Sequence, residues 1–262
     1  MPPTNIKQSN APTGSPVEKA GKTVHEAARA EAVPAPERRS RTRLFEVALA
    51  GVLGALVMLT ILIKTSPLLP VDIQITRAFQ SVHNPTWATL MSIVSWPGFP
   101  PQVFLLTAAI VVLIYFLGWH WEALAAVAAA VISSTVNELV KLAFARARPT
   151  VDLVQVFAPL NSYSFPSGHV MYYVTFLGFL WFLVFTLLKS SVKRNVALIL
   201  LTIPILLVGV SRIYLGEHWA SDVVGAYLLG SLTLTASILF YRWGKKRFFI
   251  RQPVSPHEPG RE

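Results

Sequence analysis

An arginine, a histidine and an aspartate lie close together in the C-terminal third of an otherwise apolar sequence. His218 and Asp222 are four residues apart, so on a helix they share one face and the carboxylate can hold one N–H of the imidazole. The other ring nitrogen is then free to attack. Arg212, six residues before His218, can present a planar fork of donors to the anion that is attacked. A loop between two apolar segments accounts for the three residues equally well, although charges at membrane depth tend to be functional.

Two further polar blocks adjoin apolar segments earlier in the chain. Lys141 and Arg148 lie at the end of one segment, and Phe-Pro-Ser-Gly-His at 165–169 lies at the start of the next. The order is a Lys, six residues and Arg-Pro, then Pro-Ser-Gly-His, then Ser-Arg, five residues, a His, three residues and an Asp. This order resembles the signature of the phosphatidic acid phosphatase type 2 superfamily, with every signature position filled, and the resemblance spans roughly residues 44–243.

Composition places the chain in the membrane. Of its 262 residues 53% are hydrophobic and only 14% are charged, and the mean hydropathy is +0.52, which is too apolar for an ordinary soluble domain. The absence of cysteine excludes disulfides, thiolate catalysis and Cys-ligated metal sites. A net charge of +10 is also typical of nucleic-acid binding. The positions of the charges along the chain must therefore show whether the charge reflects nucleic-acid binding or membrane orientation.

The apolar segments predict an all-α, polytopic membrane protein with six transmembrane helices in a bundle. The predicted spans are 44–63, 103–118, 123–142, 169–188, 196–215 and 222–241. Residues 1–43 are expected to form a disordered basic tail, 44–243 the six-span domain and 244–262 a second basic tail. The 65–100 connection contains a short amphipathic helix over 71–82, which we interpret as a spacer on the membrane surface in preference to a substrate lid.

The distribution of basic residues predicts how the chain is oriented in the membrane. The two tails, Arg242 just before the second tail, and the 189–194 loop hold 17 of the 23 lysines and arginines, and with six spans these three segments share one side. The positive-inside rule assigns that side to the cytoplasm, so both termini are expected there. All three motif blocks then meet at the outer face, periplasmic or extracellular. No nucleic-acid partner is needed to explain the charge.

Five residues are candidates for binding a phosphate. Lys141, Arg148 and Arg212 supply the positive charge that neutralises the equatorial oxygens of a phosphoryl group during transfer. Ser167 and Gly168 precede the fourth predicted span, so their backbone N–H groups are expected at a helix N-terminus, where anions bind readily.

The resemblance implies three catalytic residues. His218 is the expected nucleophile and forms a phosphohistidine, while Asp222 fixes its tautomer. His169 is expected to protonate the leaving oxygen and later to activate water. Because two histidines near one anion need opposite protonation states, a bell-shaped pH profile is expected.

Other polar residues near the motifs, and the catalytic candidates themselves, have alternative roles. His169, His218 and Asp222 could ligate zinc, but three converging cations favour an anion, so no metal or other cofactor is expected. Arg146 is interpreted as an anchor of its loop in preference to a phosphate ligand, and Glu217 as solvated. Ser164 either caps the fourth span or contributes to binding.

The resemblance implies a metal-independent lipid phosphatase in the cell membrane, which removes the terminal phosphate of a lipid phosphate or diphosphate. Undecaprenyl diphosphate is the substrate we expect, with phosphatidate and phosphatidylglycerol phosphate as alternatives. Two rival classes are a lipid phosphotransferase and a non-catalytic lipid-binding or transport protein. The oligomeric state stays open, and substrate specificity is assigned to the 65–100 connection and the 150–163 loop.

Overall fold

The computed structural model describes residues 35–249, with side chains from 42 to 248, and this part of the chain is helical without any strand. The predicted tails lie largely outside it. Two compact units divide at residue 50, Met1–Ala50 and Gly51–Glu262. Every contact described below lies within the second unit. The helices are α2 (Ala35–Thr65), α3 (Pro70–Gln80), α4 (Pro85–Ser95), α5 (Gln102–Phe116), α6 (His120–Phe144), α7 (Gly168–Tyr172), α8 (Gly178–Leu187), α9 (Val192–Tyr214) and α10 (Ala220–Gly244).

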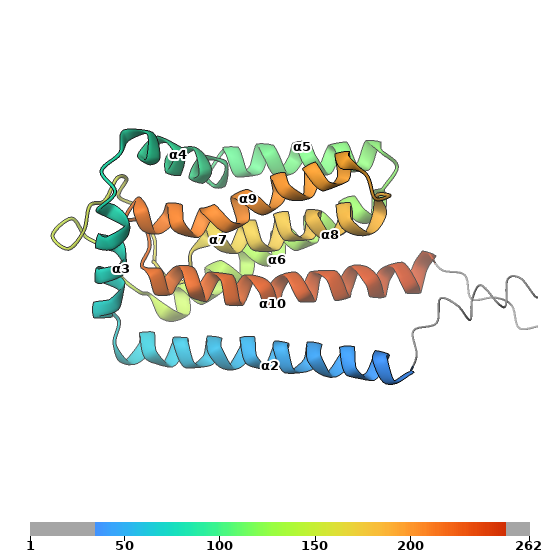
Figure 1. Ribbon diagram of the computed structural model, residues 1–262, viewed down its shortest axis with the longest axis horizontal. Helices are drawn as coiled ribbons and strands as arrows, with labels where there is room; N and C mark the ends of the chain where they lie inside the picture. The colour runs from blue at the N-terminus through green and yellow to red at the C-terminus, as the bar shows by residue number, and fades with distance from the viewer. Residues whose placement is uncertain (1–34, 250–262) are drawn as a thin grey trace, which may run out of the picture. The chain divides into compact units, whose positions relative to one another are not determined.

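Apolar helices confirm a polytopic membrane protein. Five are long and apolar enough to cross a bilayer: Thr42–Thr65, His120–Phe144, Gly168–Leu187, Val192–Tyr214 and Ala220–Phe248. The helix Gly168–Leu187 is continuous because a π-helical turn, Tyr173–Leu177, joins α7 to α8. Figure 1 shows α5, α6, α8, α9 and α10 running along a common direction, with α3 lying across one end.

The predicted second span is half of a broken pair. Pro85–Gly98 and Gln102–Phe116 meet at 61°, and by length and composition the bent pair corresponds to a broken span or a re-entrant loop. The 65–100 connection therefore contains an apolar helix, α4, which the sequence prediction missed. Asn84 starts α4 by accepting hydrogen bonds from the N–H groups of Thr86 and Trp87. The Pro97, Pro100 and Pro101 cluster explains the break, because proline removes backbone donors and clashes with the preceding turn.

The amphipathic helix predicted over 71–82 is present as α3. Its polar residues Asp72, Thr76 and Gln80 recur every fourth position and are buried. Gln80 Nε2 donates to the carbonyl oxygens of Tyr214 at 2.9 Å and Gln155 at 2.7 Å. The polar face of α3 thus faces the protein, joined to the end of α9 and to the following loop.

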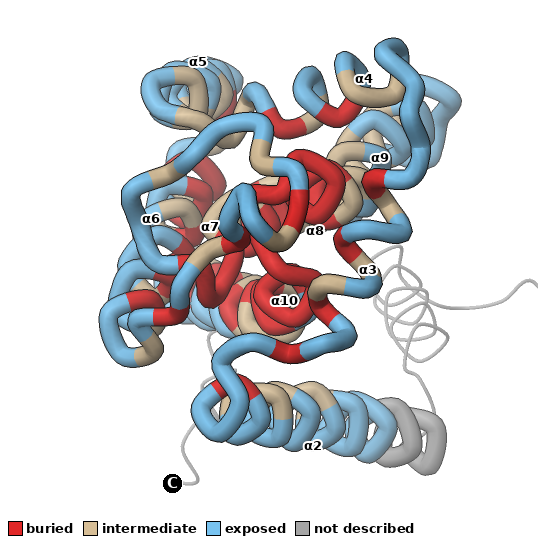
Figure 2. Tube along the Cα trace, turned by 90° about the vertical axis from the view of Figure 1, so that its left-hand side faces the viewer, coloured by how far each residue is buried: buried red, intermediate tan, exposed pale blue. Residues whose placement is uncertain are grey.

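Close packing holds the second motif block against α10. A Cβ at Gly225 would overlap the ring of Phe165, so the absence of a side chain lets this ring approach the helix. Val170, Met171, Val208 and Val223 are buried in the adjoining core. Figure 2, viewed from the α3 end, shows the buried segments gathered around α7, α8, α9 and α10.

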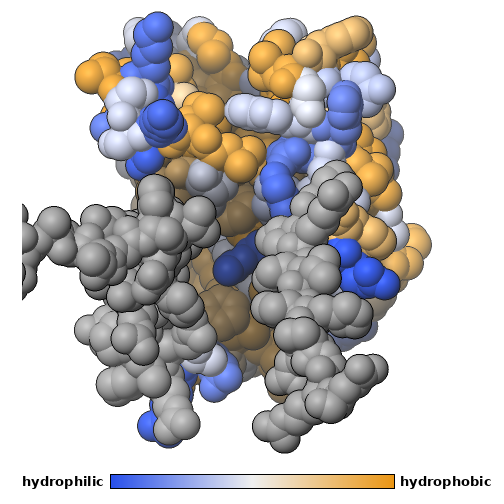
Figure 3. Space-filling view, turned by 90° about the vertical axis from the view of Figure 1, so that its right-hand side faces the viewer, coloured by the Kyte–Doolittle hydropathy of each residue, from blue (hydrophilic) through white to orange (hydrophobic). Residues whose placement is uncertain are grey.

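The opposite end of the bundle carries the turn between α8 and α9 and the C-terminus of α10 (Figure 1). Lys189 lies in that turn, Lys193 and Arg194 lie in the first turn of α9, and Lys245–Phe249 continues α10 with three further cations. Figure 3 shows hydrophilic residues interspersed with hydrophobic ones on this face. The described basic clusters and the motif blocks therefore lie at opposite ends.

Candidate active site

The fold brings the three motif blocks together at the α3 end of the bundle. Lys141 lies in the last turn of α6, His169 in the first turn of α7, and Arg212 in the last turn of α9. Asn137 of α6 donates to the Pro166 carbonyl at 3.3 Å, which connects the first and second blocks. Asn137 and the Lys141 ammonium both lie against Gly168. Lys141 Nζ also pairs with Oε1 of Glu138 at 3.1 Å.

A tight turn between α9 and α10 positions His218. Gly216 has φ +64°, and a Cβ there would overlap the Gln155 carbonyl oxygen. The N–H groups of Glu217 and His218 both donate to the Arg212 carbonyl, at 3.1 and 3.3 Å. These bonds wrap the turn around the end of α9 and leave the His218 side chain almost fully buried.

The neighbours of His218 indicate which ring nitrogen can attack. Arg148 Nη1 lies 3.2 Å from His218 Nε2 and also donates to the Glu217 carbonyl at 2.5 Å. A guanidinium is a donor only, so Nε2 acts as the acceptor and its lone pair faces Arg148. The proton is therefore assigned to Nδ1, which lies 3.7 Å from Oδ2 of Asp222.

The same surroundings favour a neutral imidazole. Burial lowers the pKa of His218 well below its usual range, and the charges of Arg148, Arg212 and Lys141 lower it further, while the backbone of Ser164 acts in the opposite direction. A neutral imidazole keeps the lone pair that nucleophilic attack requires.

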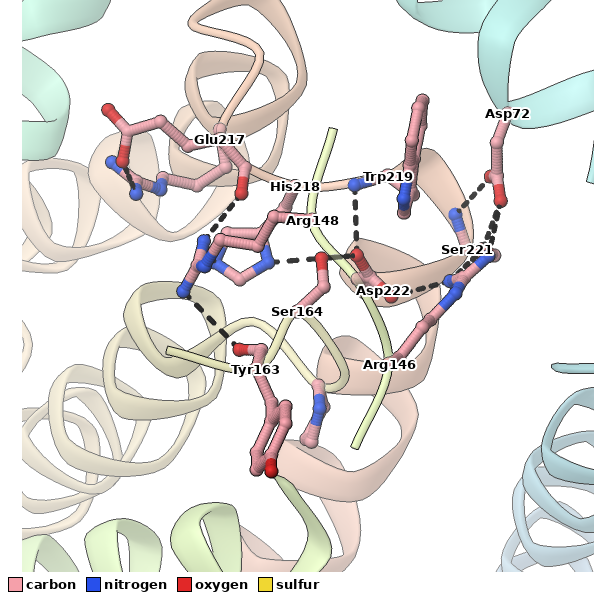
Figure 4. Close-up of polar contacts among 12 residues, drawn as sticks. Asp72, Arg146, Arg148, Tyr163, Ser164, Glu217, His218, Trp219, Ser221 and Asp222 are labelled. Atoms are coloured by element: carbon pink, nitrogen blue, oxygen red, sulfur yellow. Dashed lines mark hydrogen bonds and ion pairs between the residues drawn. The ribbon is translucent and has the colours of Figure 1, made fainter. Parts of the chain in front are cut away.

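Asp222 is held by a dense set of donors (Figure 4). Its Oδ2 accepts from Ser164 Oγ at 2.5 Å and from the Trp219 N–H at 2.9 Å, and its Oδ1 accepts from Arg146 Nη1 at 2.5 Å. At 3.7 Å the approach to His218 is an ion-pair distance, longer than the expected hydrogen bond. The carboxylate acts on the imidazole through its charge.

The contacts near Asp222 exclude one alternative for Ser164 and agree with the interpretation of Arg146 as an anchor of its loop. Ser164 does not cap the fourth span, because its hydroxyl donates to Asp222. Arg146 is a buried ligand of carboxylates: besides Asp222 it contacts Asp72, with Nη2 2.8 Å from Oδ2. Asp72 belongs to α3 and was not among the predicted site residues. Nothing in the sequence around Asp72, a polar residue in a short amphipathic segment, indicates that it faces the site.

Arg212 lies in a second buried cluster. Its Nη1 donates to Ser95 and its Nη2 pairs with Glu217, so the interpretation of Glu217 as solvated was wrong. The guanidinium carbon lies 5.1 Å from the centre of the Phe99 ring. Phe99 also contacts the His169 ring edge to face, with the centroids 4.4 Å apart. The break between α4 and α5 thus supplies site residues that the motifs do not include.

Some buried polar atoms of the predicted site residues have no hydrogen-bond partner within the described range: Ser167 Oγ, His169 Nε2, Arg212 Nε and His218 Nδ1. The Ser167 backbone N–H donates to the Asp222 carbonyl at 3.3 Å. Among residues 35–249 no group of three His, Asp or Glu side chains is placed to hold a metal ion.

Fold and site together define a multi-pass helical membrane protein whose cations surround a buried histidine. Residues 119–248 match the family model of the PAP2 superfamily, and the chain belongs to that superfamily.

Similarity to characterised proteins agrees with this family. The chain is 29% identical over 174 residues to phosphatidylglycerophosphatase B of Bacillus subtilis, covering 65% of this chain and 83% of that protein. It is 38% identical over 104 residues to an undecaprenyl-diphosphatase of Sulfolobus acidocaldarius, covering 38% of this chain and 46% of the relative.

Two solved structures share the fold. The crystal structure of a transmembrane PAP2-type phosphatidylglycerolphosphate phosphatase from Bacillus subtilis superposes with a TM-score of 0.67 at 26% identity, over 76% of this chain and 98% of that one. Aquifex aeolicus LpxE superposes with a TM-score of 0.53 at 20% identity, over 65% and 96% of the two chains.

Proposed function

We propose that this protein hydrolyses the terminal phosphate of a membrane lipid through a phosphohistidine on His218, with undecaprenyl diphosphate as the preferred substrate. The broader class follows from the family: the chain is a lipid phosphatase. The observation that carries the finer proposal is the position of His218, buried, with Nε2 3.2 Å from Arg148 Nη1. A phosphate bound by Arg148 would lie beside the attacking nitrogen.

The first step transfers the phosphoryl group to the enzyme. Nε2 of His218 attacks phosphorus, the bond from phosphorus to the leaving oxygen breaks, and its electron pair departs with that oxygen. His169 gives its proton to the leaving oxygen. The positive charge that develops on the imidazole is stabilised by Asp222, whose carboxylate lies 3.7 Å from Nδ1.

The second step returns the enzyme to its starting state. Water attacks the phosphohistidine and gives a proton to His169, the bond from phosphorus to nitrogen breaks, and its electron pair returns to Nε2. Inorganic phosphate is released. Lys141, Arg148 and Arg212 neutralise the equatorial oxygens in both transition states.

Two substrates remain in competition. Three cations around one site suit the highly charged head of a lipid diphosphate, and one relative is an undecaprenyl-diphosphatase. Phosphatidylglycerol phosphate is the second candidate, because the match to phosphatidylglycerophosphatase B covers 83% of that relative.

We further propose that the site opens at the outer face, with both termini in the cytoplasm. The support is the separation of charge along the bundle: the basic turn between α8 and α9 and the end of α10 lie away from the motif end (Figure 1). Residues 44–243 would then form the phosphatase domain, between two basic cytoplasmic tails.

Phosphate release by the purified full-length protein tests the proposal. The substrates are undecaprenyl diphosphate, phosphatidylglycerol phosphate and phosphatidate, each offered to the parent and to His218→Ala. We expect release without an added acceptor, fastest from the diphosphate, unchanged by EDTA, and absent in the variant. Parental release by His218→Ala would refute the assignment of the nucleophile, and release only with a second lipid acceptor would indicate a transferase.

A further inference from the structure

The α3 helix reaches the candidate active site through one buried carboxylate. Asp72 lies two positions into α3, and its side chain is only 1% exposed. Its Oδ2 accepts from Arg146 Nη2 at 2.8 Å and from Ser221 Oγ at 2.6 Å, while Oδ1 accepts from the Ser221 N–H at 2.8 Å. Figure 4 shows these contacts converging on the first turn of α10.

Arg146 connects this carboxylate to Asp222. One guanidinium nitrogen contacts Asp72 at 2.8 Å and another contacts Asp222 at 2.5 Å, and the Nε donates to the Pro67 carbonyl at 2.8 Å. The Arg146 side chain and both carboxylates are at most 1% exposed. A guanidinium with partners on both edges has its plane fixed, and so has the carboxylate that it contacts.

The charge of the cluster gives Asp72 a second effect. Arg146 carries one positive charge and the two aspartates carry two negative charges, so one net negative charge remains beneath His218. If Arg146 faced Asp222 alone, its charge would cancel that of the carboxylate in a region where water does not screen. Asp72 therefore lets Asp222 act on the imidazole as an anion although it is paired with an arginine.

We propose that Asp72 is a positioning residue of the phosphoryl transfer: through Arg146 and the first turn of α10 it orients Asp222 and preserves its net negative charge toward His218. This inference rests on the proposed function, because it requires His218 to gain positive charge during the reaction. It also assigns to α3 a part in the chemistry.

The first test compares Asp72→Asn with Thr76→Val in the full-length protein. Asn keeps the size of Asp72 but loses its charge and turns an amide donor toward Arg146 or Ser221. Thr76 lies on the same buried face of α3, and its hydroxyl donates only within the helix, to the Asp72 carbonyl. We expect kcat to fall about 10- to 100-fold for Asp72→Asn, as for other partners that orient a reactive group, with KM within about twofold. Thr76→Val is expected to keep the parental kcat.

A variant that combines Asp72→Asn with Asp222→Asn distinguishes a role of Asp72 in positioning Asp222 from a role only in holding α3 against the bundle. If Asp72 acts through Asp222, Asp72→Asn adds little to Asp222→Asn, and the double variant should have a kcat within about twofold of Asp222→Asn alone. Losses that multiply, or an Asp72→Asn enzyme with the parental kcat, would overturn the inference. An equal loss in Thr76→Val would also overturn it.

The controls distinguish this inference from the proposed function. Parental phosphate release by His218→Ala contradicts the proposed function whatever Asp72 does. A deep loss in His218→Ala and Asp222→Asn, together with parental kcat in Asp72→Asn, contradicts only the inference. Melting curves of each variant without substrate identify any loss of activity that follows from unfolding.

Discussion

The two sides of the candidate site differ in how completely their polar atoms are paired. Around Asp222 both carboxylate oxygens have donors, and Arg146 contacts a second carboxylate behind it. Around His169, in contrast, buried atoms of Ser167, His169 and Arg212 have no hydrogen-bond partner in the described part of the chain. The donors around Asp222 hold that carboxylate in one orientation beside His218, whose Nδ1 has no hydrogen bond within the described part of the chain, whereas the His169 side has donors available for a phosphate.

This contrast explains how one small site can hold a catalytic carboxylate in place and still have hydrogen-bonding groups free for a substrate. A buried network that is fully hydrogen-bonded specifies a single arrangement, and leaving part of a network unpaired costs stability. The cost is acceptable where a substrate later supplies the missing partners. The substrate then gains its binding energy on the His169 side of the site, where the charge of the phosphoryl group is redistributed during the reaction.

The largest expected effect comes from the paired side. Asp222→Asn keeps the shape of the carboxylate but removes its charge, and we expect kcat to fall about 10³- to 10⁴-fold, as when the acid of a catalytic triad is replaced. KM should change little, because Asp222 does not face the phosphate. Steady-state kinetics with saturating lipid substrate measure this, and a loss confined to KM would place Asp222 in binding instead.

Removing a cation from the unpaired side should have the next largest effect. Arg212→Gln loses a donor to the transferred phosphoryl group, and we expect kcat/KM to fall about 10²- to 10³-fold, in the range for one electrostatic donor. Because the substitution leaves Glu217 buried and unpaired, Arg212→Gln with Glu217→Gln is the matched control. The double variant should regain thermal stability but not activity; recovery of activity would make Arg212 structural.

Glu217 is expected to weaken phosphate binding, since its carboxylate pairs with Arg212 in the absence of ligand. Glu217→Gln frees Arg212 from a competing anion, and we expect inorganic phosphate to inhibit the variant several-fold more strongly, on the scale of a charge-assisted hydrogen bond. Competition kinetics with added phosphate measure the inhibition constant. An unchanged or weaker inhibition would mean that phosphate does not reach Arg212.

The smallest effect expected is a displacement of the acid limb of the pH profile. The lowered pKa of His218 keeps the imidazole neutral below pH 6.5, its ordinary value, so attack stays possible there. The acid limb of kcat/KM should therefore lie below pH 6.5, after correction for ionisation of the substrate measured by phosphorus NMR. In kcat the limb should lie at higher pH, because bound phosphate favours the imidazolium. Coincident limbs at pH 6.5 would contradict the neutral, buried nucleophile.

The sequence predicted the residues whose spacing is local and missed those brought in by tertiary packing. His218, Asp222 and Arg212 share one short stretch, and the Pro-Ser-Gly-His run follows Arg148 by one loop, so motif order sufficed to group them. Asp72 and Ser95 come from the 65–100 connection and carry no motif. Glu217 was misjudged because adjacency to His218 does not show that the α9–α10 turn folds it back onto Arg212.

The fold was predicted in the same uneven way. Long apolar segments identified the spans that α6, α9 and α10 form, because hydropathy over a bilayer length is a strong signal. The amphipathic pattern of α3 gave its helical state but not its orientation, since in a membrane protein the polar face can be the buried one. The α4 helix was missed because its prolines suggested a connection, and it is long and apolar enough to count toward a span only together with α5.

Trapping the phosphoenzyme tests the central claim most directly. Rapid acid-free quenching of the parent and of His169→Gln with a lipid substrate labelled in its terminal phosphate, followed by peptide mapping, locates the bound phosphoryl group. The account predicts label on Nε2 of His218 in the parent, slower labelling of His218 in His169→Gln because the leaving oxygen has lost its proton donor, and no label in His218→Ala. Label on any other side chain, or equal labelling of His218→Ala, would contradict it.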